Sequence, residues 1–116
     1  MGKNKDLGLE GEQLAANYLR EKSWHILEMN YRFSRSEVDL VASKDDLLIF
    51  VEVKTRTGTS FGQPEEFVDT KKAENIIKAA DHYIWEKDWK GKIRFDIISI
   101  IKINDIEIRH FEDAFY

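Results

Sequence analysis

Acidic and basic side chains follow two apolar segments in the middle of the chain. The segment at 47–55 begins Leu-Leu-Ile-Phe-Val and then continues with Glu52 and Lys54, while the segment at 37–43 contains Asp39. Carboxylates are preferred ligands of hard divalent cations such as Mg²⁺, and a lysine supplies a mobile positive charge. This combination is typical of metal-assisted chemistry on a phosphate.

These side chains can meet only if the two segments pair as a hairpin. The connection is too short for any other arrangement, and a two-residue turn at 45–46 makes residues face each other when their numbers sum to 91. Asp39 then lies opposite Glu52, and Glu37 lies opposite Lys54, with Cβ atoms about 4.5–5.5 Å apart. Because strand side chains alternate, the hairpin places these four charges on one face at its open end.

The same charges also fit a salt-bridge ladder at the edge of a sheet. In that interpretation Asp39 pairs with Lys54, and Glu52 pairs with Arg56. Opposite charges on neighbouring strands often pair in this way. Charge pattern alone therefore leaves a metal site and a salt-bridge ladder as equal alternatives.

Apolar periodicity predicts the elements that position these residues. We expect helices at 6–22, capped by Asp6, and at 70–87, capped by Asp69 or Thr70, and strands at 24–32, 37–43, 47–55, 92–103 and 106–111. The stretch at 55–66 contains the only proline and predicts a loop. Because a helix joins the strands at 47–55 and 92–103, these two should run parallel. The sequence predicts a mixed α/β sheet with helices packed on it, in the order α-β-β-β-α-β-β.

Composition limits the classes of protein that fit. The 116 residues suffice for one domain, 1–116, and 42% of them are apolar, which excludes a disordered chain although 34% are charged. The absence of cysteine excludes disulfides and thiolate metal sites. A net charge of −4 argues against a general nucleic-acid coating protein, but it does not exclude a nucleic-acid enzyme that gathers acidic residues for a metal and confines its basic residues to one face.

The chain has no apolar run of about 18 residues and no signal-like start. We therefore expect a cytoplasmic protein with no membrane segment. His25, His82 and His110 have no ligand-like spacing, and Asp96 lies among apolar residues where a structural hydrogen-bonding role fits.

Longer segments resemble the bacterial YraN family of predicted endonucleases, which belongs to the PD-(D/E)xK nuclease superfamily. The resemblance extends from about residue 8 to residue 100 and is carried by GLEGEQLAANYL (8–19), NYR (30–32), SEVDLVA (36–42), FVEVKTR (50–56), KKAENIIKAADHYI (71–84) and RFDII (94–98). Where the family usually has Gly-Glu-Ile-Asp, this chain has Ser36-Glu37-Val38-Asp39, so both carboxylates remain. The resemblance implies a restriction-endonuclease-like fold, similar in its core to archaeal Holliday-junction resolvases.

The resemblance also implies an activity, namely hydrolysis of DNA phosphodiester bonds with Mg²⁺ or Mn²⁺. Asp39 and Glu52 would hold the metal with the Val53 carbonyl as a further ligand, and Lys54 would orient the attacking water or stabilise charge on the phosphate. Glu12 would join the site from the first helix. Small residues beside Glu12, namely Gly8, Gly11, Ala15 and Ala16, should let that helix approach the sheet closely.

Other residues complete the expected site. Arg32, Arg56 and Lys72 are candidates for contacts with DNA phosphates. Glu37 either supports the metal ligands or pairs with Lys54. Branched or junction DNA and a homodimer follow by analogy with the resolvases, and Trp85 with Trp89 could form an exposed dimer contact.

Two other functions remain open. The first is a catalytically silent DNA-binding or assembly module that keeps the nuclease fold. The second is a protein-interaction domain, which would bind neither DNA nor metal.

Overall fold

The structure, a computed structural model, describes residues 3–57 and 69–115 of the chain. Its elements are α1 (Lys3–Glu21), β1 (His25–Phe33), β2 (Ser36–Lys44), β3 (Leu47–Thr57), α2 (Thr70–Lys87), β4 (Lys92–Lys102) and β5 (Ile106–Phe111). The predicted order α-β-β-β-α-β-β is confirmed. Of the stretch at 55–66 that predicted a loop, residues up to 57 belong to β3 and the remainder lies outside the described residues.

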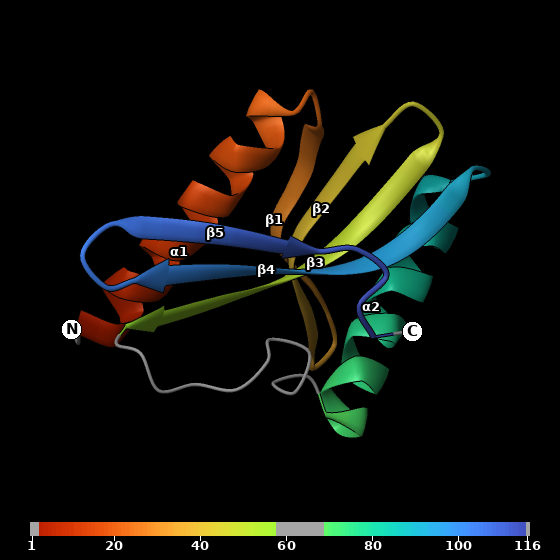
Figure 1. Cartoon of the computed structure of the whole chain (residues 1–116). Coiled ribbons are helices and arrows are strands. Elements are labelled where there is room, and N and C mark those ends of the chain that lie inside the picture. The colour runs from red at the N-terminus through yellow and green to blue at the C-terminus, as the bar shows by residue number, and fades with distance from the viewer. Residues whose placement is uncertain (1–2, 58–68, 116) are drawn as a thin grey trace.

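The five strands form one sheet in the order β1-β2-β3-β4-β5, with α1 and α2 on opposite faces (Figure 1). Strands β3 and β4 run parallel, as predicted for two strands joined through a helix, and the other neighbours run antiparallel. The mixed α/β sheet with helices packed on it is therefore the observed fold.

The core consists of two apolar layers, one on each side of the sheet. On β3, alternate side chains point to opposite faces, so Ile49 and Val51 pack under α1 while Leu48 and Phe50 pack under α2. The layer under α1 also contains Ala15, Ala16 and Leu19 of the helix and Ile98 and Ile100 of β4, all fully buried. Because β3 is covered on both faces, its end is held firmly where the charged residues begin.

The two helices differ in how well their starts were predicted. Helix α2 covers 70–87 as expected, and the Asp69 Oδ1 accepts a hydrogen bond of 2.8 Å from the Lys72 backbone N–H. The prediction that Asp6 caps α1 is wrong, because the helix begins at Lys3 and Asp6 lies inside it. Residues 3–5 contain no proline or glycine to stop the helix there.

The β1–β2 hairpin rotates about its own axis halfway along. Met29 packs on the α1 side and Tyr31 on the α2 side, although residues two apart on a regular strand share a face. Between them Asn30 has a φ of 57°, a left-handed conformation that asparagine adopts more readily than most residues. Opposite them on β2, Leu40 packs on the α1 side and Val38 on the α2 side.

Because of this rotation, the prediction that Glu37, Asp39 and Val41 share one face of β2 is wrong. A regular strand would place Glu37, Asp39 and Val41 on one face, but Val41 now shares the α2 side with Val38. The change lies beside Asn30 of β1, with its positive φ, and periodicity in the sequence gives no sign of it. Asp39 lies at the rotation point, between Val38 and Leu40, where β2 turns from one core layer to the other.

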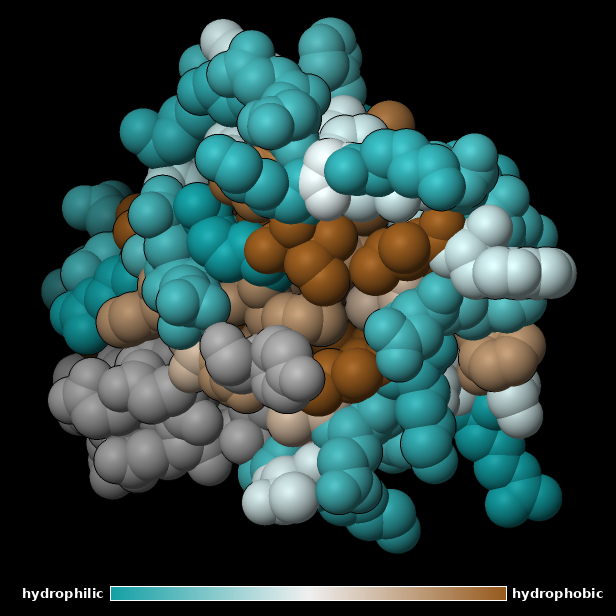
Figure 2. All heavy atoms as spheres, turned by 90° about the vertical axis from the view of Figure 1, so that its right-hand side faces the viewer, coloured by the Kyte–Doolittle hydropathy of each residue, from teal (hydrophilic) through white to brown (hydrophobic). Residues whose placement is uncertain are grey.

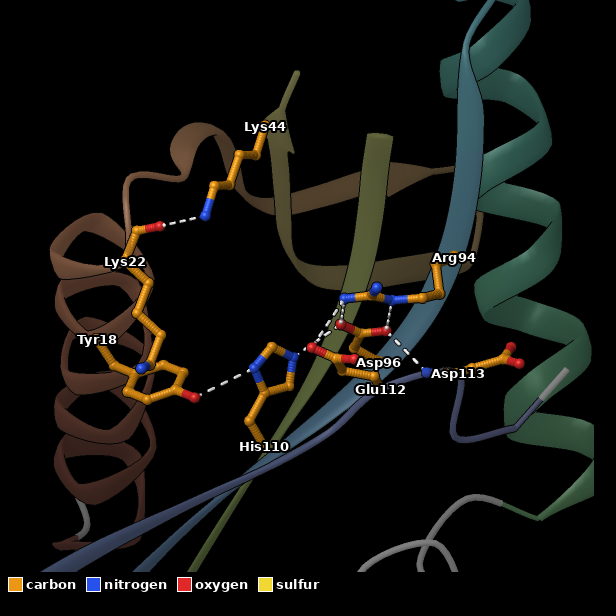
Figure 3. Close-up of polar contacts among 8 residues, drawn as sticks. All are labelled: Tyr18, Lys22, Lys44, Arg94, Asp96, His110, Glu112 and Asp113. Carbon is orange, nitrogen blue, oxygen red and sulfur yellow. Dashed lines mark hydrogen bonds and ion pairs between the residues drawn. The ribbon is translucent and has the colours of Figure 1, made fainter. Parts of the chain in front are cut away.

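A polar cluster lies between the sheet and α1 and is centred on the fully buried Asp96 of β4 (Figure 3). Arg94 donates two hydrogen bonds of 2.9 Å to its carboxylate, His110 Nε2 lies 2.7 Å from it, and the Asp113 N–H donates at 3.1 Å. His110 Nδ1 in turn lies 3.3 Å from the hydroxyl of Tyr18 on α1. We call these five residues the Asp96 network; it confirms the structural role expected for Asp96.

The side of the molecule that carries α2 has apolar side chains at its surface, surrounded by hydrophilic ones (Figure 2). Trp89 is partly buried against the α2 layer, where its Nε1 donates to the Lys92 carbonyl at 3.0 Å. The expected exposed pair of Trp85 and Trp89 is therefore wrong, because only Trp85 is exposed. Among the described residues, no helix is long and apolar enough to cross a membrane.

Replacing Asp96 with alanine should destabilise the fold strongly. Arg94 would lose its two charge-assisted hydrogen bonds, and breaking a buried ion pair from one side costs about 3 kcal/mol or more. Urea unfolding at pH 7 measures the loss. Glu112, which is exposed and lies 3.6 Å from Arg94, provides the control: Glu112→Ala should cost no more than about 0.5 kcal/mol. Equal losses in both variants would contradict the structural role of the network.

Candidate active site

Two adjoining polar hollows open where β2 and β3 separate. The larger has a volume of about 370 Å³ and is lined by Gly8, Glu12, Asp39, Glu52, Val53, Lys54, Thr55, Arg56 and Lys72. The smaller, of about 200 Å³, is lined by Arg35, Glu37, Asp39, Glu52, Lys72, Asn75 and Ile76. Asp39, Glu52 and Lys72 line both hollows, so they form the centre of the site.

The separation of the strands creates this site. Residues of β2 and β3 pair from Lys44–Leu47 to Leu40–Val51, and their numbers sum to 91 as predicted, but the pairing ends there. Beyond it the Val53 N–H donates to Asp39 Oδ2 at 2.8 Å. A side-chain carboxylate thus takes the hydrogen bond that a backbone carbonyl of β2 would otherwise accept.

The predicted backbone pairing of Asp39 with Glu52 and of Glu37 with Lys54 is therefore wrong, although the Asp39 and Glu52 side chains do meet. Glu37 instead forms an ion pair with Arg32 of β1, the two atoms lying 3.4 Å apart. It still lines the smaller hollow beside Asp39. Glu37 remains a neighbour of the central carboxylates without the predicted partner.

Glu52 is buried, with 3% of its surface exposed, and forms ion pairs with two lysines. Its Oε2 lies 3.1 Å from Lys54 Nζ and 2.7 Å from Lys72 Nζ. Lys72 belongs to the first turn of α2, so the helix on one face of the sheet brings a positive charge to the end of β3. The salt-bridge ladder considered from the sequence paired Glu52 with Arg56, whereas the structure pairs Glu52 with Lys54 and Lys72. Because Glu52 is buried, these ion pairs are not solvated pairs at the surface.

Asp39 is the most strongly perturbed titratable group of the site. Its pKa is raised to about 8. Burial is the largest cause and the charge of the neighbouring Glu52 the next, while the hydrogen bond from Val53 lowers the pKa. Burial of Lys72 alone would lower its pKa, but its contact with Glu52 outweighs this, and the pKa is raised. Burial beside Glu52 therefore makes the ionised form of Asp39 costly, and a proton or a cation relieves that cost.

Helix α1 reaches the site because Gly11 has no side chain. A Cβ at position 11 would overlap the hydroxyl of Thr55 on β3, so only glycine allows this approach. The expected role of Gly8 is wrong, because a Cβ there would meet nothing within 4 Å. Gly8 instead borders the larger hollow.

The close approach places Glu12 at the wall of the larger hollow. Its Oε1 accepts a hydrogen bond of 3.0 Å from Asn30 Nδ2, the residue at which the hairpin rotates. Burial raises the pKa of Glu12, the hydrogen bond from Asn30 lowers it, and the charges of Glu37 and Glu52 raise it further. The sequence pointed to Glu12, but it did not reveal Asn30 as its partner.

The residues expected to contact phosphates divide into two groups. Lys72 and Arg56 line the larger hollow, and Arg56 Nη1 donates to the Thr55 carbonyl at 2.9 Å. Arg32 lines neither hollow; its side chain is 73% exposed beside Glu37. Two residues that line the smaller hollow, Arg35 and Asn75, were not among the candidates.

Each of these two residues had a signal in the sequence. Arg35 lies at the tip of the β1–β2 hairpin, in the Phe-Ser-Arg-Ser segment next to the predicted site. Asn75 follows Lys72 by one turn of α2 and therefore shares its face.

A group of three carboxylates around one ion is not formed. Within residues 3–57 and 69–115, no three His, Asp or Glu side chains lie close enough together to hold a metal ion. An ion at the centre of the site would instead rely on Asp39 and Glu52, with water or substrate oxygens completing its shell. Mg²⁺ is commonly bound in that way, by one or two protein carboxylates.

Comparison with known proteins identifies close relatives over the whole length of the chain. The model of "Uncharacterised protein family UPF0102" matches residues 11–100. A UPF0102 protein of Christiangramia forsetii is 44% identical over 117 residues, covering 100% of this chain and 98% of the relative. A UPF0102 protein of Syntrophomonas wolfei is 46% identical over 114 residues, covering 97% and 99%, respectively. One from Bacteroides thetaiotaomicron is 42% identical over 117 residues, covering 100% and 97%.

The raised pKa of Asp39 predicts how stability depends on pH without divalent cations. The unfolded chain loses this proton near the ordinary pKa of 3.8, whereas the folded protein keeps it up to about 8. Folding therefore becomes less favourable as pH rises between these values. Asp39→Asn removes this titration and should raise the free energy of unfolding at pH 9 by about 1–3 kcal/mol relative to the wild type, with a smaller difference at pH 5.

Urea unfolding in EDTA at pH 5 and pH 9 measures this effect. Asp81, which is exposed on α2, supplies the control variant Asp81→Asn, whose difference from the wild type should not change with pH. A difference between Asp39→Asn and the wild type that is the same at both pH values would show that Asp39 is ionised in the folded protein at neutral pH.

Proposed function

We propose that this chain, which belongs to protein family UPF0102, is a Mg²⁺- or Mn²⁺-dependent DNA endonuclease of the PD-(D/E)xK superfamily. The observation that carries the proposal is the meeting of Asp39 and Glu52 in a polar hollow with Lys54 and Lys72. A buried carboxylate, a half-buried carboxylate and two ammonium groups at the open end of one hairpin match the requirements of phosphodiester hydrolysis.

The donor set fits a hard divalent cation. Asp39 and Glu52 supply carboxylate oxygens, and burial together with the charge of Glu52 raises the pKa of Asp39, an effect that a cation would oppose. The backbone of Val53 lines the same hollow, and its carbonyl is the further oxygen proposed for the shell. A divalent cation at this position polarises a phosphate and makes water a better nucleophile at neutral pH.

The two lysines have different roles at the substrate phosphate. Lys54 is nearly buried, with 14% of its side chain exposed, so it stays beside Glu52 and orients a water or stabilises charge on the phosphate. Lys72 is more exposed and stands on the first turn of α2. When DNA is bound, its ammonium group would contact a phosphate oxygen, and Glu52 would then be free to hold the cation.

Glu12 and Arg56 act at the edge of the site. Glu12 is held by Asn30 on the wall of the larger hollow, where its carboxylate orients water around the cation. Arg56 lines the same hollow and contacts the DNA backbone next to the scissile phosphate. The resemblance to junction resolvases adds branched DNA to the substrates that need to be compared.

Cleavage of DNA tests the proposal directly. We expect the wild type to cut at least one of branched, single-stranded or duplex DNA in Mg²⁺ or Mn²⁺. Glu52→Gln and Lys54→Ala should each lower the rate about 100-fold or more, because each removes a charge at the phosphate. The exposed residues Glu107 and Lys90 give the matched controls Glu107→Gln and Lys90→Ala, which should retain the activity. Cleavage that persists in both site variants would place the activity elsewhere.

Metal binding provides a test that does not depend on cleavage. Calorimetric titration with Mn²⁺ should show binding to the wild type, and Asp39→Ala should weaken it about tenfold or more because a ligand is lost. Asp81→Ala, on the exposed face of α2, should bind as the wild type does. Identical isotherms for Asp39→Ala and the wild type would contradict the metal site.

A further inference from the structure

An aromatic cluster lies on the surface where the tip of the β1–β2 hairpin meets α2. Phe33 of β1 stacks on His82 of α2, with ring centroids 3.9 Å apart and planes 10° from parallel. Trp85 lies one turn further along the helix, its ring centroid 5.7 Å from that of His82. We call these three residues the aromatic platform.

The platform is exposed, although its side chains are of the kind that proteins usually bury. Trp85 is 76% exposed and Phe33 is 40% exposed. Together with Lys78 and Asp81 they line a shallow hollow of about 420 Å³. Contiguous exposed aromatic surface of this kind commonly marks a binding site.

The platform is continuous with the candidate active site through two elements. At the hairpin tip, Phe33 lines the platform hollow while Arg35, two residues later, lines the smaller hollow of the site. Along α2, Lys72 and Asn75 line the site, and Lys78 and His82 line the platform hollow on the following turns of the helix. Lys72 and His82 are ten residues apart, or about 15 Å along the helix.

Basic side chains along this path can contact the phosphates of a nucleic-acid strand. Lys72 and Arg35 line the smaller hollow of the site and Lys78 lines the platform hollow, while the acidic groups there are Glu37, Asp39 and Glu52 in the first and Asp81 in the second. A distance of about 15 Å corresponds to about four steps of a stacked strand, and to fewer steps when the strand is extended. A strand with its phosphate at Glu52 and Lys72 can therefore reach the platform.

We propose that the aromatic platform stacks against an unpaired nucleobase of the strand whose phosphate occupies the candidate active site. The proposal rests on the nuclease function proposed above and adds a substrate class to it, namely DNA with a single-stranded segment within a few nucleotides of the cut. A paired base offers only its edge in a groove, whereas an unpaired base offers the flat face that Trp85 and Phe33 can contact. Stacking on aromatic rings requires no particular base sequence.

Binding of single-stranded and duplex DNA of equal length tests the proposal. Fluorescence anisotropy with labelled oligonucleotides in Ca²⁺, a cation that also prefers oxygen ligands, reports affinity. Trp85→Ala should weaken binding of the single strand about 5- to 100-fold, as expected for the loss of base stacking, and should change duplex affinity less than about twofold. Phe33→Ala should act in the same direction. Ile106→Ala, which truncates an exposed apolar residue at the start of β5, is the matched control and should alter neither affinity.

The outcomes separate this inference from the nuclease proposal. If the wild type binds and cuts DNA but Trp85→Ala and Phe33→Ala bind the single strand as the wild type does, the platform proposal falls and the nuclease proposal stands. If the wild type neither binds nor cuts any DNA, the nuclease proposal itself fails and the platform proposal with it. If Trp85→Ala keeps its DNA affinity but abolishes self-association in sedimentation experiments, the platform is a contact between copies of the chain, and the proposal is overturned.

Discussion

Where β2 leaves β3, the amide of Val53 donates its hydrogen bond to the carboxylate of Asp39 and not to a backbone carbonyl. A buried amide needs a partner, so this contact holds the strand end in place while the two backbones move apart. The separation opens the hollows, and Glu52 lies in their wall because it directly precedes the amide that is held. The site thus depends on the Asp39 side chain, which replaces a backbone carbonyl as the partner of one β3 amide.

Electrostatics then determines what the hollows can hold. Asp39, Glu52 and Glu12 come from three different elements, and two lysines bind the same oxygen of Glu52. The burial that raises the pKa of Asp39 and of Glu12 acts on carboxylates that the fold cannot move apart, since Gly11 packs against Thr55 and Asn30 holds Glu12. Such an arrangement is costly to maintain unless a proton or a bound ligand offsets the charge.

The sequence predicted what local rules determine. The two-residue turn at Asp45 set the hairpin register, and the cap at Asp69 set the start of α2, because both depend on neighbouring residues alone. It did not predict the rotation at Asn30, since the apolar pattern of the two strands does not show where a hairpin changes face. The ion pair of Lys72 with Glu52 also could not be predicted, because it depends on where α2 lies against the sheet.

The Asp96 network has a consequence for the persistence of the folded state. Its members at positions 18, 94, 96, 110 and 113 come from α1, β4, β5 and the segment after β5, so the network joins the first helix to the last two strands of the chain. Contacts between segments so distant in sequence act mainly by slowing unfolding wherever they are absent from the folding transition state. Because α1 carries both Tyr18 and Glu12, the contact of Tyr18 with His110 also holds that helix beside the carboxylates. One buried aspartate thus connects the anchoring of the last strands with the position of Glu12 at the site.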